Sequence, residues 1–154
     1  MTKATTRPRM RTVYDLLGRV AEHILEEPRR YYQSSWIVKG KPGSVLQTIG
    51  DHQIIMPSCG TAACRAGWLV KLCDRRVPRL GTLIADRAEQ IINSGHEYDN
   101  VRDDWRMVTR SDAVQGRPGT LAYAKRGASG LRKFMRAHKS YLQARLLKDV
   151  RKKR

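Results

Sequence analysis

Apolar residues recur at three- and four-residue intervals near the start of the chain, a spacing typical of one face of an α-helix. The main stripe consists of Val13, Leu17, Val20 and Ile24. Thr12 stands where an N-cap is expected, and Asp15 follows three residues later, so the two can form a capping box. Pro28 disfavours helical geometry at the residue before it. The sequence therefore predicts a helix over about 12–27.

Two more helices are predicted in the middle of the chain. The first begins at Thr61, as its N-cap, and runs to about Cys73, with small residues on one side and bulky ones on the other. The second begins near Thr82 and ends at Gly95, a residue suited to the left-handed conformation that closes many helices. Both segments favour a mainly α fold.

Short β-prone runs lie between the first two predicted helices. Val45–Ile49 and Gln53–Met56 flank Gly50 and Asp51, and this arrangement predicts a β-hairpin at about 45–56. Residues 96–120 are rich in turn-forming side chains and are expected to be mostly irregular.

A helical pattern resumes at Leu131 and is expected to continue to the end of the chain. Its apolar face consists of Leu131, Phe134, Met135, His138, Leu142 and Leu146. Arg132, Lys133, Arg136 and Lys139 project from the remainder. His138 is interpreted as a partly buried packing residue, and the helix as amphipathic with a cationic back.

The net charge of +17 is unevenly distributed along the 154 residues. Residues 1–12 carry four basic and no acidic side chains, and residues 13–116 carry 14 basic and 13 acidic ones. Residues 117–154 carry 13 basic side chains against one acidic, which gives +12. The expected organisation is therefore a basic N-terminal arm (1–11), a globular helical domain (12–116) and a basic segment with an amphipathic helix (117–154).

Like charges concentrated in a short segment repel one another unless a polyanion or counterions neutralise them. DNA, RNA or the exposed RNA of a ribonucleoprotein is the expected partner, bound mainly through phosphates by a protein without enzymatic activity. Tyr123 could stack on a base, although a single aromatic gives little support for sequence-specific recognition. The candidate binding residues are Lys125, Arg126, Arg132, Lys133, Arg136, Lys139, Arg151, Lys152, Lys153 and Arg154.

Several familiar motifs do not occur in the sequence. It contains no zinc finger, RNP motif, Walker loop or GxGxxG, and no apolar run of about 18 residues. The three cysteines are an odd number at spacings unlike a disulfide scaffold, so a reducing, cytoplasmic location without a secretion signal is expected. No cofactor is expected.

The stretch CGTAACRAGW (59–68) allows three interpretations. Cys59 near a helix N-terminus would have a lowered thiol pKa and could serve as the nucleophile of an enzyme or redox protein. Cys59, Cys64 and Cys73 could hold a metal with a histidine, although their spacing lacks the paired CxxC of structural zinc sites. A packing helix with small residues at Ala63 and Gly67 explains the residue choices better and is the favoured interpretation.

The same stretch follows the pattern C-G-T-x-A-C-x-A-G-W, which resembles the signature of small, largely uncharacterised proteins of bacteriophages and bacterial genomes. EEPRRYYQSSW (26–36) and LGTLIADRAEQII (80–92) are similar to the flanking segments of that group, so the resemblance covers about residues 13–95. The longer insertion between Trp36 and Cys59 and the basic C-terminal third depart from it. The resemblance implies a phage-related origin and a location in the host bacterial cytoplasm, but no particular function. Small phage proteins commonly bind nucleic acid or a host or defence protein.

The sequence allows three alternatives to nucleic-acid binding besides a cysteine-dependent enzyme or redox protein. A surface formed by Arg29, Arg30, Tyr31 and Tyr32 could contact an acidic host protein, which would make the chain an inhibitor or adaptor. The basic amphipathic helix could lie on an anionic membrane surface. The basic tail could also be solvated without a dedicated ligand.

Overall fold

The computed structural model describes residues 9–33, 37–49, 51–56, 61–74, 78, 81–93, 99–110 and 113–151. Within these residues the fold is mainly α, with seven α-helices, one 3-10 turn and two small antiparallel sheets. The expected fold class, a small helical domain with a short hairpin, is confirmed.

Helix α1 (Val13–Glu26) begins and ends within one residue of the predicted bounds. The Thr12 hydroxyl accepts a hydrogen bond from the Asp15 amide at 3.2 Å, and the Asp15 carboxylate accepts from the Thr12 amide at 3.1 Å. These bonds form the predicted capping box, which satisfies two backbone donors that a helix start otherwise leaves unpaired. The predicted stripe is fully buried.

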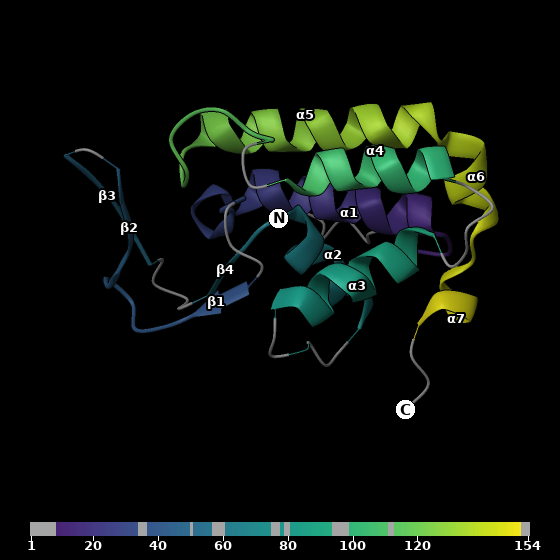
Figure 1. Cartoon of the computed structure of the whole chain (residues 1–154), viewed down its shortest axis with the longest axis horizontal. Helices are drawn as coiled ribbons and strands as arrows, with labels where there is room; N and C mark the ends of the chain where they lie inside the picture. Colours follow the sequence, from purple (N-terminus) through teal and green to yellow (C-terminus); the bar gives the residue numbers. More distant parts are fainter. Residues whose placement is uncertain are drawn as a thin grey trace, which may run out of the picture.

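Four more helices close a ring with α1. They are α2 (Arg65–Cys73), α3 (Gly81–Ile92), α4 (Asp99–Thr109) and α5 (Leu121–Ala137). Each packs on the next, and α1 packs on both α2 and α5. Figure 1 shows α5 lying along α1 with the opposite chain direction, so the end of α5 lies at the start of α1.

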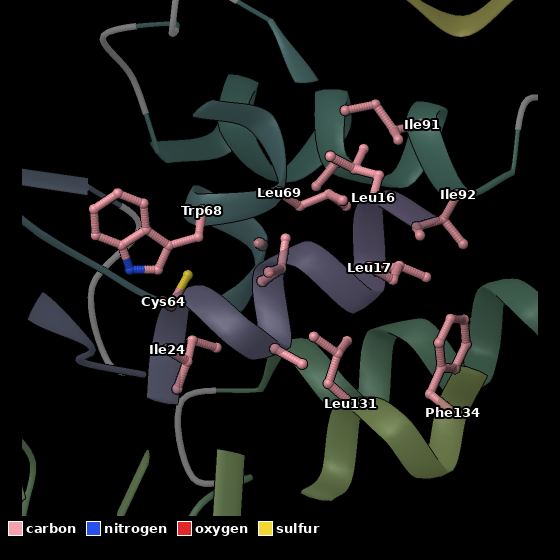
Figure 2. Close-up of a cluster of buried hydrophobic side chains, with 14 of the residues drawn as sticks. Leu16, Leu17, Ile24, Cys64, Trp68, Leu69, Ile91, Ile92, Leu131 and Phe134 are labelled. Atoms are coloured by element: carbon pink, nitrogen blue, oxygen red, sulfur yellow. The ribbon is translucent and has the colours of Figure 1, made fainter. Parts of the chain in front are cut away.

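The hydrophobic core draws on every helix of the ring. Figure 2 shows Leu16, Leu17 and Ile24 of α1 between Trp68 and Leu69 of α2 on one side and the α5 residues Leu131 and Phe134 on the other. Ile91 and Ile92 of α3 and Trp105 of α4 complete the same cluster. Residues before and after position 117 therefore share one core, although the sequence is nearly neutral before this position and strongly basic after it.

A buried ion pair links α3 to the end of α2 and to the C-terminal segment. Arg87 of α3 donates to both carboxylate oxygens of Asp74, at 2.5 and 2.8 Å, and to the carbonyl of Val150 at 2.8 Å. The hydrogen bond with Asp74 raises the pKa of Arg87, against the opposing effect of burial. The pair therefore holds the end of α2, α3 and the C-terminal segment together.

The strands form two separate pairs. β2 (Val45–Ile49) and β3 (His52–Ile55) form the predicted hairpin, which extends away from the helices in Figure 1. β1 (Ile37–Lys39) pairs with β4 (Thr61–Ala63), and a 3-10 turn, η1 (Pro28–Arg30), connects α1 to this region. The second pair was not predicted, because its strands are only three residues long and are 24 residues apart in sequence.

The predicted start of the second helix at Thr61 is wrong. Residues 61–63 are strand β4, and α2 begins at Arg65 with Cys64 as its N-cap. The Cys64 sulfur accepts from the Gly67 amide at 3.4 Å. Pairing with β1 keeps Thr61 extended, and this long-range contact overrides the local preference of threonine for a cap. The third helix, α3, was predicted correctly near its start; Gly95 lies outside the described residues.

The prediction of mostly irregular structure over 96–120 is wrong for its first half, where α4 occupies Asp99–Thr109. Val101 and Trp105 are each 2% exposed, and the partly buried Val108 follows on the same face. This apolar spacing is helical, but six charged side chains between 99 and 110 mask it in the sequence.

The C-terminal helix is longer at its start and shorter at its end than predicted. α5 begins at Leu121 with Thr120 as N-cap, ten residues before Leu131, and ends at Ala137. Two short helices follow, α6 (Lys139–Ala144) and α7 (Leu147–Val150). Because the chain turns after α6, Leu147 is buried and the predicted seam residue Leu146 is 38% exposed.

Candidate nucleic-acid interface

Helix α5 has one face in the core and one in solvent. The buried face consists of Tyr123, Ala124, Gly127, Ala128, Leu131, Phe134 and Met135. The exposed basic residues on the opposite side are Lys125, Arg126, Arg132, Lys133 and Arg136, and the helix contains no acidic residue. At 1.5 Å of rise per residue, these five positive charges lie along about 17 Å of helix. The structure therefore brings five of the ten candidate residues onto one face.

Small residues on the inner face let α5 approach the core closely. A Cβ added at Gly127 would lie 2.5 Å from the Tyr31 hydroxyl oxygen, and one at Gly130 would lie 2.8 Å from a nitrogen of the Arg65 guanidinium. These two glycines, one turn apart, leave space for two large polar side chains. α5 is thus held at a fixed distance and rotation, which keeps its basic face outward.

Arg65 joins α5 to three other segments although it is only 2% exposed. Its guanidinium donates to Gln33 Oε1 at 3.2 Å, to the Gly127 carbonyl at 3.1 Å and to the Val108 carbonyl. Burial lowers the pKa of Arg65 from its ordinary value. Every one of these acceptors is neutral, so the network satisfies the donors of a buried cation by hydrogen bonds alone.

The expectation that Tyr123 stacks on a base is wrong. Tyr123 is 2% exposed, and its ring centre lies 5.2 Å from that of Tyr31. Its hydroxyl oxygen accepts a hydrogen bond from the backbone amide of Gln33 at 3.2 Å. Burial raises its pKa. The side chain closes the Arg65 network and is not available to a ligand.

The cations of the α5 outer face differ in how they are held. Within the described part of the chain, Lys125, Arg132, Lys133 and Arg136 form no ion pair and no hydrogen bond through their side chains. Arg126 donates to the Gln115 carbonyl at 3.1 Å and so fixes the preceding loop, in which Gly116 has a φ of +117°. Four of the five charges can therefore take a new partner without losing an existing one.

Several acidic side chains of the body are paired with basic ones nearby. Glu89 pairs with Arg106 at 2.7 Å, Asp74 pairs with Arg87, and Arg19 lies 3.6 Å from both Glu22 and Glu26. The charge of the body thus cancels locally, whereas that of α5 does not. The excess positive charge of the chain is concentrated at this outer face and at the two ends.

The remaining candidate residues lie beyond α5. Lys139 opens α6, is exposed, and has its Nζ 5.9 Å from the centre of the Tyr14 ring. Arg151 is exposed, and Lys152, Lys153 and Arg154 lie outside the described residues. His138, between α5 and α6, has its Nε2 2.7 Å from Asp104 Oδ2 and its ring 5.0 Å from Phe134, as expected for a packing residue.

The aromatic surface proposed for a host-protein contact does not exist as such. Tyr31 is fully buried and Tyr32 is 5% exposed, and only Arg29 of that group is exposed. Arg30 lies over the Trp68 ring at 4.7 Å, and the Trp68 indole donates to the Arg30 carbonyl at 3.2 Å. The segment RRYY therefore forms an edge of the core.

The two described cysteines are packing residues. Burial raises the pKa of the Cys64 thiol to about 11 and that of Cys73 to about 11, so both stay protonated at neutral pH. Cys59 lies outside the described residues, and its role as a nucleophile stays one of the alternatives. Where side chains are described, no three of the His, Cys, Asp and Glu type come together as metal ligands would.

Comparison of the chain with protein families, with curated proteins and with solved structures found no match. Among the helices described, none has the length and apolar composition needed to cross a bilayer. The candidate interface therefore depends on the geometry and charge of α5.

Proposed function

We propose that this protein is a non-enzymatic nucleic-acid-binding protein that contacts phosphates through the outer face of α5. The observation that carries the proposal is the row of exposed cations on a helix whose opposite face is locked into the core. DNA, RNA and the exposed RNA of a ribonucleoprotein share the phosphate chemistry that such a row would bind. A phage-related role remains part of the proposal and comes only from the resemblance over about residues 13–95.

The spacing of the charges suits a phosphate backbone. Each strand of B-DNA presents one phosphate per 3.4 Å of helix axis, so about 17 Å corresponds to about five phosphates. A helix held rigidly by its inner face loses little backbone freedom on binding compared with a free tail. Electrostatic attraction at this face is therefore expected to supply most of the affinity.

Binding is expected to have little sequence preference. Phosphate contacts fix the position of a protein on nucleic acid but carry no direct information about sequence. The described outer face of α5 presents no aromatic side chain for stacking, since Tyr123 and Phe134 are both buried. We expect affinities that depend strongly on salt and weakly on base composition.

The test is fluorescence anisotropy with labelled DNA and RNA, single- and double-stranded, between about 50 and 300 mM salt. R132Q/K133Q/R136Q removes three exposed charges of α5, and R29Q/K39Q/K41Q removes three exposed charges from η1 and the β1–β2 region as a matched control. Each phosphate contact contributes about −0.9 to the log–log salt slope on duplex DNA, so the α5 variant should reduce the slope by up to about 2.7.

An equal loss of affinity in both variants would contradict the proposal, because it would indicate attraction by total charge alone. Binding that does not respond to salt would contradict it as well. Tight binding to anionic vesicles with none to nucleic acid would favour the membrane alternative. Thermal unfolding followed by circular dichroism verifies that both variants fold.

A further inference from the structure

The segments that precede α1 and follow α6, next to the two basic ends of the sequence, lie side by side. The Leu147 amide donates to the Arg11 carbonyl at 2.9 Å, and the Val13 amide donates to the Arg145 carbonyl at 2.9 Å. Thr12 and Leu146 lie opposite each other in an antiparallel β-bridge between these bonds. Segments more than 130 residues apart in sequence are thus paired by backbone hydrogen bonds at a fixed position.

This pairing gathers positive charge that the sequence divides between its ends. Arg9 and Arg11 precede the bridge, Lys148 and Arg151 follow it, and all four side chains are exposed. The sequence continues with more basic residues on both sides: Arg7 and Lys3 before Arg9, and Lys152, Lys153 and Arg154 after Arg151.

Two acidic side chains lie in the same region and reduce this charge only in part. The Asp15 carboxylate accepts from the backbone amides of Arg11 and Thr12, at 3.0 and 3.1 Å, so it is engaged by the helix start. Asp149 is exposed on α7. The four exposed cations exceed these two carboxylates.

Residues 9–13 and 145–151, called the paired ends, lie at one end of the α5 outer face. α1 and α5 are antiparallel, so the start of α1, where the bridge forms, lies beside the end of α5 (Figure 1). Lys139, two residues after α5, lies over the ring of Tyr14 in the first turn of α1. Lys139 therefore connects the charges of α5 to those of the paired ends.

We propose that the paired ends, represented by Arg9, Arg11, Lys148 and Arg151, are a second phosphate-contact site for the nucleic acid bound by α5. The inference rests on the proposed function, because it assigns the second site to the same ligand. Full affinity then requires a nucleic acid long enough to cover the α5 face, Lys139 and the paired ends together.

The length of the nucleic acid provides the test. The α5 face matches about five phosphates of one strand, so a stem of about 8 base pairs can cover it, whereas one of about 20 base pairs can also reach the second site. The probes are labelled DNA and RNA hairpins with stems of these two lengths, used with the full-length chain at about 100 mM salt.

The quadruple variant R9Q/R11Q/K148Q/R151Q should bind the short stem as the unmodified protein does and bind the long stem about tenfold or more weakly. Its salt slope on the long DNA stem should fall by up to about 3.6, since four contacts of about 0.9 each are removed. R9K/R11K/K148R/R151K, which keeps every charge, should bind both stems normally.

The failure of this inference differs from the failure of the proposed function. An unchanged affinity of the quadruple variant for the long stem, or an equal loss on both stems, would overturn the second site. A normal affinity of R132Q/K133Q/R136Q for both stems would overturn the role of α5 instead. A loss restricted to DNA or to RNA would identify which of the two the second site contacts.

Discussion

At the scale of single residues, two helical glycines in this protein have opposite requirements. A Cβ at Gly127 would lie 2.5 Å from the Tyr31 hydroxyl oxygen, whereas one at Gly18 of α1 would lie 3.5 Å from the terminal carbon of Met135, an ordinary contact. Alanine is about 0.5–1 kcal/mol more favourable than glycine inside a helix. The same substitution should therefore have opposite signs at the two positions.

We expect Gly127→Ala to lower the free energy of unfolding by about 1–3 kcal/mol, because Tyr31 and the Arg65 network must shift. Gly18→Ala should raise it by up to about 1 kcal/mol. Urea unfolding followed by circular dichroism measures both. A neutral Gly127→Ala would mean that Tyr31 has room to move.

We expect the protein to lose stability at high pH because the buried thiol of Cys64 has a raised pKa. Its pKa is about 11 in the folded protein and 9.0 when unperturbed, so between these values the unfolded chain releases the proton while the folded chain keeps it. This stability is fully present below about pH 9 and is lost as the pH rises toward 11. Cys73 and Tyr31, whose pKa values burial also raises, act in the same direction.

Cys64→Ser removes the titrating group and keeps a side chain that can cap α2. We expect this variant to lose less stability than the unmodified protein between pH 8.5 and 10.5, measured as the shift of the urea midpoint. Parallel losses in the two proteins would show that Cys64 does not titrate in this range.

At the scale of elements, α5 contributes one face to the hydrophobic core and carries five exposed basic side chains on the other. Burial of Tyr123, Leu131, Phe134 and Met135 contributes about 6–12 kcal/mol at about 1.5–3 kcal/mol each. That contribution is comparable to the total stability of about 5–15 kcal/mol of a typical domain. A fragment that ends before α5 should therefore not fold.

We expect residues 1–120 to show no cooperative thermal transition, whereas residues 1–151 should unfold at nearly the temperature of the full chain. Calorimetry of both fragments measures this. A cooperative transition in the 1–120 fragment would show that the remaining helices form a stable core alone. Loss of nucleic-acid binding in the 1–120 fragment would follow from unfolding, so only point variants test the charges of α5.

What could be predicted from the sequence at this scale depended on whether local residues determine the element. Thr12, Asp15 and Pro28 mark α1 within its own segment, and its bounds were predicted to within one residue. The start of α5 was missed because residues 121–130 are mostly small. Tyr31 and Arg65, which approach from distant parts of the chain, explain the glycines at 127 and 130.

The candidate site was predicted in part for the same reason. The exposed positions of Arg132, Lys133 and Arg136 follow from charge and helical spacing, whereas Lys125 lies in the part of α5 that was missed. The burial of Tyr123 and the pairing of residues 11–13 with 145–147 depend on tertiary contacts, which a helical pattern does not contain.

At the scale of the whole molecule, the separation of a locally neutral body from concentrated basic surfaces predicts how stability depends on salt. The five cations of α5 repel one another along about 17 Å, and the Debye length falls from about 30 Å at 0.01 M to about 8 Å at 0.15 M salt. Added salt should therefore stabilise the unbound protein.

We expect the thermal midpoint to rise by a few degrees between about 10 and 150 mM sodium chloride, and to rise less in R132Q/K133Q/R136Q. Differential scanning calorimetry without nucleic acid measures this. R29Q/K39Q/K41Q is the control and should keep most of the rise. A midpoint that falls with salt would show that ion pairs such as Arg106–Glu89 outweigh the repulsion.

Because the β-bridge between Thr12 and Leu146 brings the first and last described segments together, the order of the helices along the chain could be changed without changing how they pack. A short glycine–serine linker from residue 151 to residue 9 would close the chain into a ring, because the two segments already run side by side. New termini could then be opened in the turn at Asp51, on the hairpin that extends from the helices. Such a circular permutant would keep the helix contacts of the core and would convert the bridge from a long-range contact into a local one.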